Sequence, residues 1–255
     1  MKKIFLFQLI FIILFFQKIY AQDIGQTEIT AEEGIEVFQQ EKYYLLKKNV
    51  KINSENFNLS ADIIKAYFEK DLYDIIKIEA ESNAFLSSSK GVEIKGQKIY
   101  FDIKKEIVNV FGENSLVKNL NIRMSSNQSI QIDNINGNFE LNGKNSVLKT
   151  ADTYILGEYI KGKFINIDDK NVIENLLATD QSLVNFKNKK VDMFSKRAIY
   201  NKNENTIELF DNVKIISDGE TILGDYAIIN TLNKSYKVNS QESKKVKILI
   251  NNTDE

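Results

Sequence analysis

The segment LKKNVKINSENFNLSAD at residues 46–62 recurs as LFDNVKIISDGETILGD at residues 209–225. In both copies Leu begins the segment, Asn-Val-Lys-Ile follows at the same place, and Asp ends it, without a gap. A unit that returns in register over this distance indicates a chain built from repeats. Repeats of this size bury a hydrophobic face only when they stack on their neighbours, so the whole array must form one continuous structure.

A looser unit, apolar-x-small-polar-x-apolar, starts at seven places, and Ala, Gly or Ser fills the small position in six of them. The unit that starts at Ile130 instead carries Ile132 in the small position, and the first unit ends on Gly34. Small residues suit a strand that turns a corner or packs backbone against backbone. Seven copies, each of two strands and a turn, predict about 14 to 16 strands. The starts are Ile29, Leu59, Ile94, Ile130, Ile155, Met193 and Ile222.

The hydrophobic pattern has a period of two along the chain after residue 21, and no stretch shows the 3.6-residue period of a helix. The sequence therefore predicts an all-β protein. Asn142-Gly143 is a dipeptide that favours a type I′ hairpin turn, and Gly112-Glu113-Asn114 closes another apolar run. Asx-rich segments at 168–171, 201–205 and 233–234 form turns without proline. We expect a meander of hairpins.

Composition excludes several classes of function. The chain has 255 residues, 43% of them hydrophobic and 27% charged, as in ordinary folded proteins. A net charge of -1 gives no basic field for nucleic acid. The sequence contains no cysteine and no histidine, which excludes disulfides, thiolate or imidazole metal sites and histidine-based catalysis. We therefore expect no enzyme activity, no catalytic residue, no cofactor and no metal.

Residues 1–21 form a segment of a different kind. Two lysines precede an apolar run over residues 4–16, and the segment ends at the small residue Ala21. This order is typical of a secretory signal peptide that is cleaved near Ala21. The alternative is a retained transmembrane anchor, but the run is shorter than the about 20 residues that a membrane-spanning helix needs. We expect an exported protein of residues 22–255 that lies outside the cytoplasm.

Three stretches near the start carry a resemblance to a known family. ITAEEGIEV at residues 29–37, KNVKI at 48–52 and FNLSAD at 57–62, in this order, are similar to the opening of LptA/OstA proteins. Residues 209–229, with Asn-Val-Lys-Ile and Gly-Asp-Tyr-Ala, resemble the same element again. Family members often have Gly before Asn-Val, where this chain has Lys48, and the chain carries more repeats than a compact LptA protein.

The resemblance implies a twisted, open β-jellyroll whose two antiparallel sheets form a V. It implies a carrier that shields the acyl chains of lipopolysaccharide between the inner and outer membranes. The implied partners are lipopolysaccharide, an inner-membrane LptC-like component and an outer-membrane LptD-like component. The extra repeats either lengthen one groove or build two stacked jellyrolls, at about residues 28–125 and 126–250.

If alternate residues of every strand face inward, an apolar set lines the interior and Lys, Asn and Glu cover the outside. We expect this set to form a groove for lipid. The alternative is an ordinary closed core that admits no ligand. The predicted groove residues are Ile35, Val37, Ile99, Phe101, Phe139, Leu141, Ile165 and Ile167.

A stacked array also has two ends. Edge strands near residues 28–37 and 244–250 would be unpaired, and an unpaired edge needs protection or pairs with another chain. The family resemblance implies the second outcome, a head-to-tail assembly by strand addition. The alternative is that Lys244 and Lys245 block the edge. The predicted edge residues are Ile29, Ile35, Val246 and Ile248.

Three other hypotheses compete with the lipid carrier. A structural β-repeat protein of the cell envelope would have a dry core and bind no lipid. The sister component LptC has the same implied fold with an uncleaved anchor. An envelope polysaccharide hydrolase would need a carboxylate pair, but adjacent strand residues such as Glu32 and Glu33 point to opposite faces. The basic cluster from Lys187 to Arg197 either meets lipid phosphates or forms a solvated outer face.

Overall fold

The computed structural model describes residues 27–70, 74–167, 170–188, 191–217, 219–241 and 245–250. The predicted signal peptide with Ala21, the Asp168-Asp169 turn and Lys244 lie outside the described residues. Within these ranges no helix has the length and apolar character needed to cross a bilayer.

The described chain is all-β, as predicted, with antiparallel pairing throughout. The strands are β1 (Glu28–Thr30), β2 (Gly34–Phe38), β3 (Tyr43–Asn53), β4 (Phe57–Phe68), β5 (Ile75–Ser88), β6 (Glu93–Asp102), β7 (Ile107–Phe111), β8 (Ser115–Lys118), β9 (Arg123–Ser126), β10 (Ser129–Asp133), β11 (Asn138–Lys149), β12 (Thr153–Ile167), β13 (Lys170–Asn188), β14 (Val191–Asn201), β15 (Thr206–Ser217), β16 (Glu220–Asn230), β17 (Tyr236–Asn239) and β18 (Lys247–Ile250).

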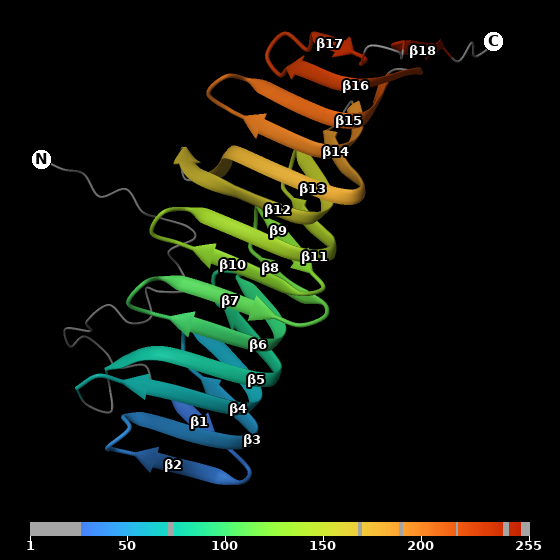
Figure 1. Cartoon of the computed structure of the whole chain (residues 1–255). Coiled ribbons are helices and arrows are strands. Elements are labelled where there is room, and N and C mark those ends of the chain that lie inside the picture. The colour runs from blue at the N-terminus through green and yellow to red at the C-terminus, as the bar shows by residue number, and fades with distance from the viewer. Residues whose placement is uncertain are drawn as a thin grey trace, which may run out of the picture.

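Most long strands bend near their middle, so each contributes one half to each of two sheets, and the strands stack from β2 at one end to β17 at the other (Figure 1). We call these sheets arm A and arm B. Strand β3 shows the pattern, because residues 43–47 pair with β2 in arm A and residues 51–53 pair with β1 in arm B. At the far end β16 likewise pairs with β17 in arm A and β18 in arm B.

The corner between the arms is a line of β-bulges. The pairing of β3 with β4 shifts between Lys47 and Val50, and Lys48 and Asn49 in the shift have φ of 62° and 47°. The second copy of the repeat does the same, because Asp211 and Asn212 have φ of 63° and 54°. A left-handed conformation is costly for residues other than Gly, Asn and Asp, so Lys48 is strained where family members often carry Gly.

The predicted small residues lie opposite these bulges. Ala61 pairs with Val50, Gly96 with Ala84, and Gly224 with Val213, each directly beside a register shift. Gly96 has no room for a side chain, because an added Cβ would lie 2.6 Å from Cγ1 of Val110. The repeat pattern therefore marks the corner of each bent strand.

Two details of the sequence prediction are wrong. The unit assigned to Ile130 does not reach the corner, because Ile132 pairs with Phe139 inside arm A. The small residue at this corner is the buried Ser126, in a unit that starts at Met124. Asn142-Gly143 is not a hairpin turn but the bend within β11, with φ of 120° at Gly143. Hairpin turns and strand corners both require positive φ, so the dipeptide alone does not distinguish them.

The array is not open throughout. Strands β6, β7, β10, β11, β9 and β8 pair in that order and return to β6, which closes a ring of six strands. The ring forms because two bent strands are each split into halves, β7 with β8 and β9 with β10. A backbone hydrogen bond from Gly112 N to Gln128 O, 2.9 Å long, links the two bends inside the ring.

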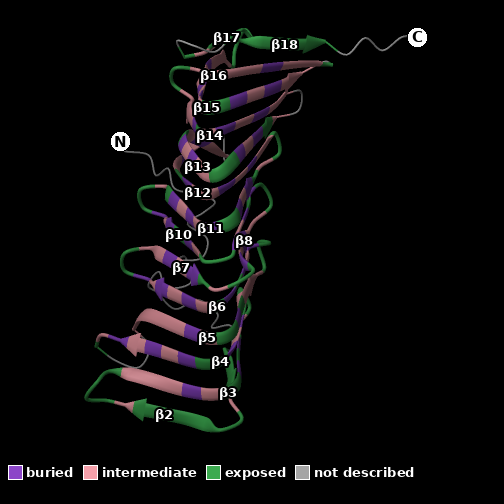
Figure 2. Ribbon diagram, turned by 45° about the vertical axis from the view of Figure 1, so that its right-hand side comes forward, coloured by how far each residue is buried: buried purple, intermediate pink, exposed green. Residues whose placement is uncertain are grey.

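The core lies between the arms. Buried side chains alternate with more exposed ones along strands such as β6 and β11, and one continuous cluster of buried residues extends from Leu46 to Ala227 (Figure 2). Ser126 and Ser146 are buried polar residues at the corner, joined by a 3.2 Å hydrogen bond between their hydroxyls. The interior is therefore almost wholly apolar, as the period-two pattern predicted.

Candidate functional site: a groove between the arms

Two adjoining hollows of about 370 Å³ and 600 Å³ lie between the arms in the C-terminal half. They share Asp152, Asn188, Ile207 and Thr231, so we treat them as one inter-arm groove. The apolar residues that line it are Val172, Ile173, Phe186, Val191, Tyr200, Ile207, Ile215, Ile229 and Tyr236.

Single bent strands supply both walls of the groove. Strand β15 places Ile207 in arm A and Ile215 in arm B, on either side of the bulge between Phe210 and Val213. Strand β13 does the same with Ile173 and Phe186. The corner therefore fixes the distance between the walls, and the groove runs along the stacking direction of the strands.

Small side chains near the corner leave room in this half of the interior. Ala178, Ala198 and Ala227 are fully buried at the first inward positions of arm A after the bulge. The corresponding positions of earlier strands hold the larger Ile64 and Ile99, with a small residue at Ala80. This difference is visible in the sequence, because the last two repeat units end in Ala, whereas four of the five earlier units end in Ile. That signal could have located the groove.

The groove has an apolar floor and a polar rim. Phe186 and Ile207 are buried, and the ring centroids of Phe186 and Tyr200 lie 6.4 Å apart. Burial raises the pKa of the Tyr200 hydroxyl, so this group stays neutral at ordinary pH. The described rim consists mainly of amide and hydroxyl side chains, with Asp152, Glu220 and Lys234 as its charged members.

None of the eight predicted groove residues lines the inter-arm groove. Four of them, Ile99, Phe101, Phe139 and Leu141, are buried in the interior of the preceding strands. The other four lie elsewhere. Ile35 and Val37 are on the interior side of the end strand β2 and are exposed. Ile165 and Ile167 alternate with the buried Phe164 and therefore point to the outer face of β12.

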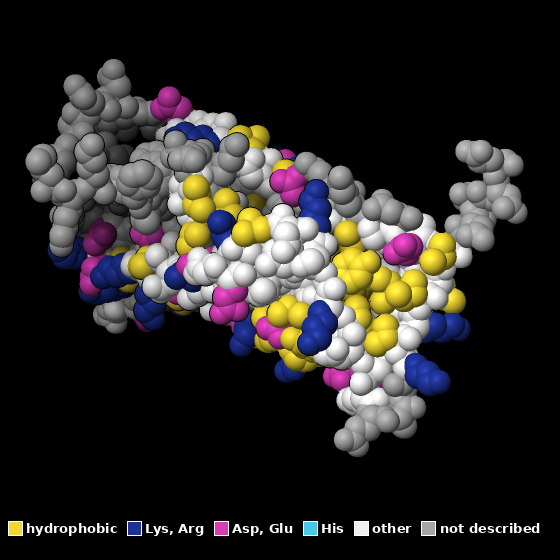
Figure 3. All heavy atoms as spheres, turned by 90° about the horizontal axis from the view of Figure 1, so that it is seen from above, with side chains coloured by type: hydrophobic (Ala, Val, Ile, Leu, Met, Phe, Trp, Pro, Cys, Tyr) yellow, Lys and Arg dark blue, Asp and Glu magenta, His cyan; other side chains and the backbone are white. Residues whose placement is uncertain are grey.

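The four predicted edge residues lie at the two ends of the stack and are exposed, with Ile248 the most exposed at 56%. Among the described strands, β2 pairs with β3 alone, and β17 and β18 each pair with β16 alone. Figure 3, seen from the β17 end, shows hydrophobic side chains gathered on that face. Both ends of the array therefore present apolar strands with one unpaired side.

The basic cluster lies outside the groove. Lys187 pairs with Asp192 at 3.0 Å, and the guanidinium of Arg197 lies 4.1 Å from the ring centre of Phe210. Lys196 donates a hydrogen bond to the carbonyl of Gln181. These contacts place the described basic residues on the outer face, and Lys189 and Lys190 lie outside the described residues.

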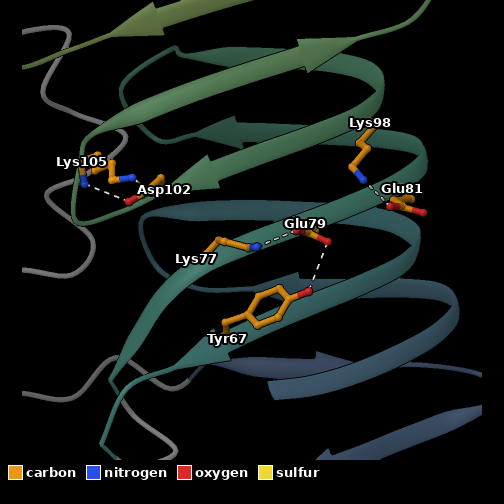
Figure 4. A network of polar contacts seen from close by, with 7 residues as sticks. All are labelled: Tyr67, Lys77, Glu79, Glu81, Lys98, Asp102 and Lys105. Atoms are coloured by element: carbon orange, nitrogen blue, oxygen red, sulfur yellow. Dashed lines mark hydrogen bonds and ion pairs between the residues drawn. The ribbon is translucent and has the colours of Figure 1, made fainter. Parts of the chain in front are cut away.

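The outer face of arm A in the N-terminal half carries a network of aromatic and charged side chains (Figure 4). Lys77 forms a 2.8 Å ion pair with Glu79 and lies 4.1 Å from the ring centre of Tyr67. Partial burial opposes the ionisation of Glu79, but the hydrogen bond and charge of Lys77 outweigh it and lower the pKa of the carboxyl. Within the described ranges no cluster of acidic side chains could hold a metal ion.

The fold and the groove define a class: an all-β protein whose bent strands hold an apolar groove between two sheets. Residues 163–247 match the family model of OstA-like proteins, which confirms the predicted family resemblance for this part of the chain. The matched residues supply most of the groove lining.

Solved structures also match. One is the crystal structure of LptH from Pseudomonas aeruginosa, described as the LptA homologous periplasmic component of the conserved lipopolysaccharide transport device. The match has a TM-score of 0.42 and 16% sequence identity, and covers 51% of this chain and 94% of that chain. No curated protein matches the sequence.

Proposed function

We propose that this protein is a periplasmic lipid carrier that holds acyl chains of lipopolysaccharide in the inter-arm groove as part of the lipopolysaccharide transport machinery. The observation that carries the proposal is the groove itself, with an apolar floor, a polar rim and an open side along the stack. The OstA-like match over the residues that line it supports the same function.

Hydrophobic burial is sufficient for this task. Burying one methylene group stabilises the complex by roughly 0.8 kcal/mol. An acyl chain of about twelve methylene groups therefore gains on the order of 10 kcal/mol of binding free energy before the entropy cost of ordering the chain is subtracted. In a groove that runs along the stack, a methylene that leaves at one end is replaced by another that enters. Sliding along the groove therefore costs less free energy than escape into water, and transport needs no chemical step.

The exposed end strands support a bridge between membranes. Ile29 and Ile35 at one end and Val246 and Ile248 at the other lie on or beside strands with one unpaired side. Strand addition at such edges produces a head-to-tail contact, which continues into filaments of the same chain or ends on a different partner. The partners proposed for the two ends are LptC-like and LptD-like components. An export signal over residues 1–21 would place the chain in the periplasm.

Two neighbouring residues of β16 provide a matched test. Ile229 lines the groove and pairs with Ile207, whereas Ile228 points to the outer face and pairs with Glu208. Native mass spectrometry of gently purified protein should show a lipopolysaccharide adduct in the wild type and in Ile228→Asp. Ile229→Asp should lose it, because a carboxylate in the groove wall opposes burial of the acyl chain.

Two results would contradict the proposal. An apo mass that does not change after incubation with lipopolysaccharide would favour the structural β-repeat protein. Equal adduct in both aspartate variants would mean that lipid binds elsewhere on the chain.

A further inference from the structure

The groove has different lengths on its two walls. On the arm B side its lining continues to Asn121 and Thr150, next to β9 and β11. On the arm A side the lining ends in β13, at Asn171, Val172 and Ile173. Something in arm A therefore fills the space that arm B leaves open.

Two phenylalanine rings occupy that space. Phe164 pairs in register with Ile173, the last arm A residue of the groove, and is itself buried. The centroid of its ring lies 4.4 Å from the ring centroid of Phe139 on β11, and the angle between the two ring planes is 30°. We call Phe139 and Phe164 the phenylalanine pair.

A glycine makes the position of this pair possible. Phe139 pairs with Gly162, and a Cβ added there would lie 2.8 Å from Cζ of Phe139 and 2.4 Å from the carbonyl oxygen of Asn175. The ring of Phe139 therefore lies over the backbone of β12, where any side chain would displace it. The backbone of Phe164 is held as well, because its N–H donates a 2.9 Å hydrogen bond to Gly137.

We infer that the phenylalanine pair is the end stop of the groove and sets the length of acyl chain that it accepts, an inference that rests on the proposed function. The rings separate the groove from the apolar interior of β10 and β11, where Ile132 and Leu141 are buried. An acyl chain that reaches Ile173 meets the face of Phe164 and extends no further along arm A. Removal of either ring joins the groove to space that the ring filled.

The test is a binding series with saturated fatty acids of increasing chain length, measured below their micelle concentrations by calorimetry. In the wild type, affinity should rise about fourfold with each methylene, the factor that corresponds to about 0.8 kcal/mol, until the groove is full. Beyond that length the affinity should stay constant. In Phe164→Ala and Phe139→Ala the rise should continue to longer chains.

Phe186→Ala is the matched control. Phe186 is also a buried ring that faces the interior, but it lies in the floor of the groove and not at its end. Its loss should weaken binding at every chain length and leave the length at which affinity becomes constant unchanged. If Phe164→Ala does not fold, Phe164→Leu should still shift that length, by a smaller amount.

The outcomes distinguish the end stop from the proposed function. If the affinity becomes constant at the same acyl-chain length in the wild type and in both variants of the phenylalanine pair, the end stop is overturned and the proposed carrier function is not affected. Absence of binding at every length, in the wild type as well, would overturn the proposed function and the end stop with it.

Discussion

The N-terminal and C-terminal halves are built from the same repeat but differ in how their interiors are filled. In β3 to β11 the inward positions near the arm tips hold large buried side chains such as Phe68, Phe101 and Phe139. In β12 to β17 the same row combines buried side chains such as Phe164 and Ile207 with the partly exposed Tyr200 and Ile229, and the inter-arm groove opens. Corner geometry is common to both halves, so the side chains beyond the corner decide between a filled core and an open groove.

The difference shows that the repeat specifies a fold and not a site. Bulges opposite small residues bend every long strand in the same way, whether the interior is full or hollow. Replacing Ile by Ala at the first inward position changes only the volume that remains between the arms. A groove arises where that lost volume is not refilled from the opposite arm.

The largest expected effect separates a closed core from a groove wall. Ile64 is fully buried in β4. The substitution Ile64→Ala should lower the unfolding free energy by about 3 kcal/mol, since the cavity that it leaves cannot collapse. Ile229 is only partly buried, and Ile229→Ala should cost about 1 kcal/mol by the same measure. Urea unfolding of both variants measures the difference. Equal costs would show that the two halves are packed alike.

The corner glycines should show the next largest effect. Gly96→Ala pushes a methyl group into Val110 of β7, which is fixed between β6 and β10, and should cost about 2 kcal/mol. Gly224→Ala meets Val238 of β17, which pairs with β16 alone among the described strands and can shift. Its cost should be smaller. Thermal unfolding of the two variants tests this order, and a larger loss for Gly224→Ala would reverse it.

A third comparison uses the two copies of the bulge. Lys48 in the first copy has φ of 62°, and Asp211 in the second has φ of 63°. Lys48→Gly should raise the unfolding free energy by about 0.5 to 1 kcal/mol, because glycine adopts this conformation without strain. Asp211→Gly should gain less, since Asp tolerates positive φ better than Lys. Destabilisation by Lys48→Gly would mean that the lysine side chain contributes more than its strain removes.

The smallest expected effects are opposite responses to pH. Lys77 lowers the pKa of Glu79 in the N-terminal half, so this contribution is present above the ordinary carboxyl pKa and is lost as pH falls through the lowered value. In the C-terminal half, burial and a 2.7 Å hydrogen bond to Glu208 raise the pKa of Tyr226 to about 12. That contribution is present below about pH 10, the ordinary tyrosine pKa, and is lost toward pH 12.

Two variants separate these contributions. Glu79→Gln should reduce the acid loss of stability, and it should also reduce part of the alkaline loss, because Glu79 raises the pKa of Lys77 and of Tyr67. Tyr226→Phe should reduce the alkaline loss alone. Urea unfolding midpoints over the pH range measure both slopes, and identical pH profiles for wild type and variants would refute the assignment.

The sequence predicted much of the fold. Period-two alternation predicted the all-β class. Eighteen strands are described, and counting the half-strand pairs β1/β2, β7/β8, β9/β10 and β17/β18 as one bent strand each leaves fourteen, within the predicted range. It failed where one signal has two meanings. Asn142-Gly143 satisfies the φ of a hairpin turn as well as that of a corner, and Ile130 fits the repeat pattern in a strand that turns at Ser126 instead.

The groove was harder to predict. Alternation assigns a face to each residue, and it placed Phe101, Phe139 and Leu141 inside the interior. It does not say how much of the space between two arms is filled, because that depends on side chains from strands far apart in sequence. Phe164 and Ile173 become neighbours only after β12 and β13 pair, and Phe186 joins Ile173 in the groove lining only because β13 bends.

The sequence alone determined the repeat, the alternation and the small corner residues, because each is a local requirement of a bent strand. It also carried the family resemblance that the match over residues 163–247 confirms. Only the tertiary structure decided which inward residues touch the opposite arm, where the interior opens, and that Phe139 and Phe164 meet at the end of the groove. Packing is a sum over neighbours in space, and a linear pattern does not contain that sum.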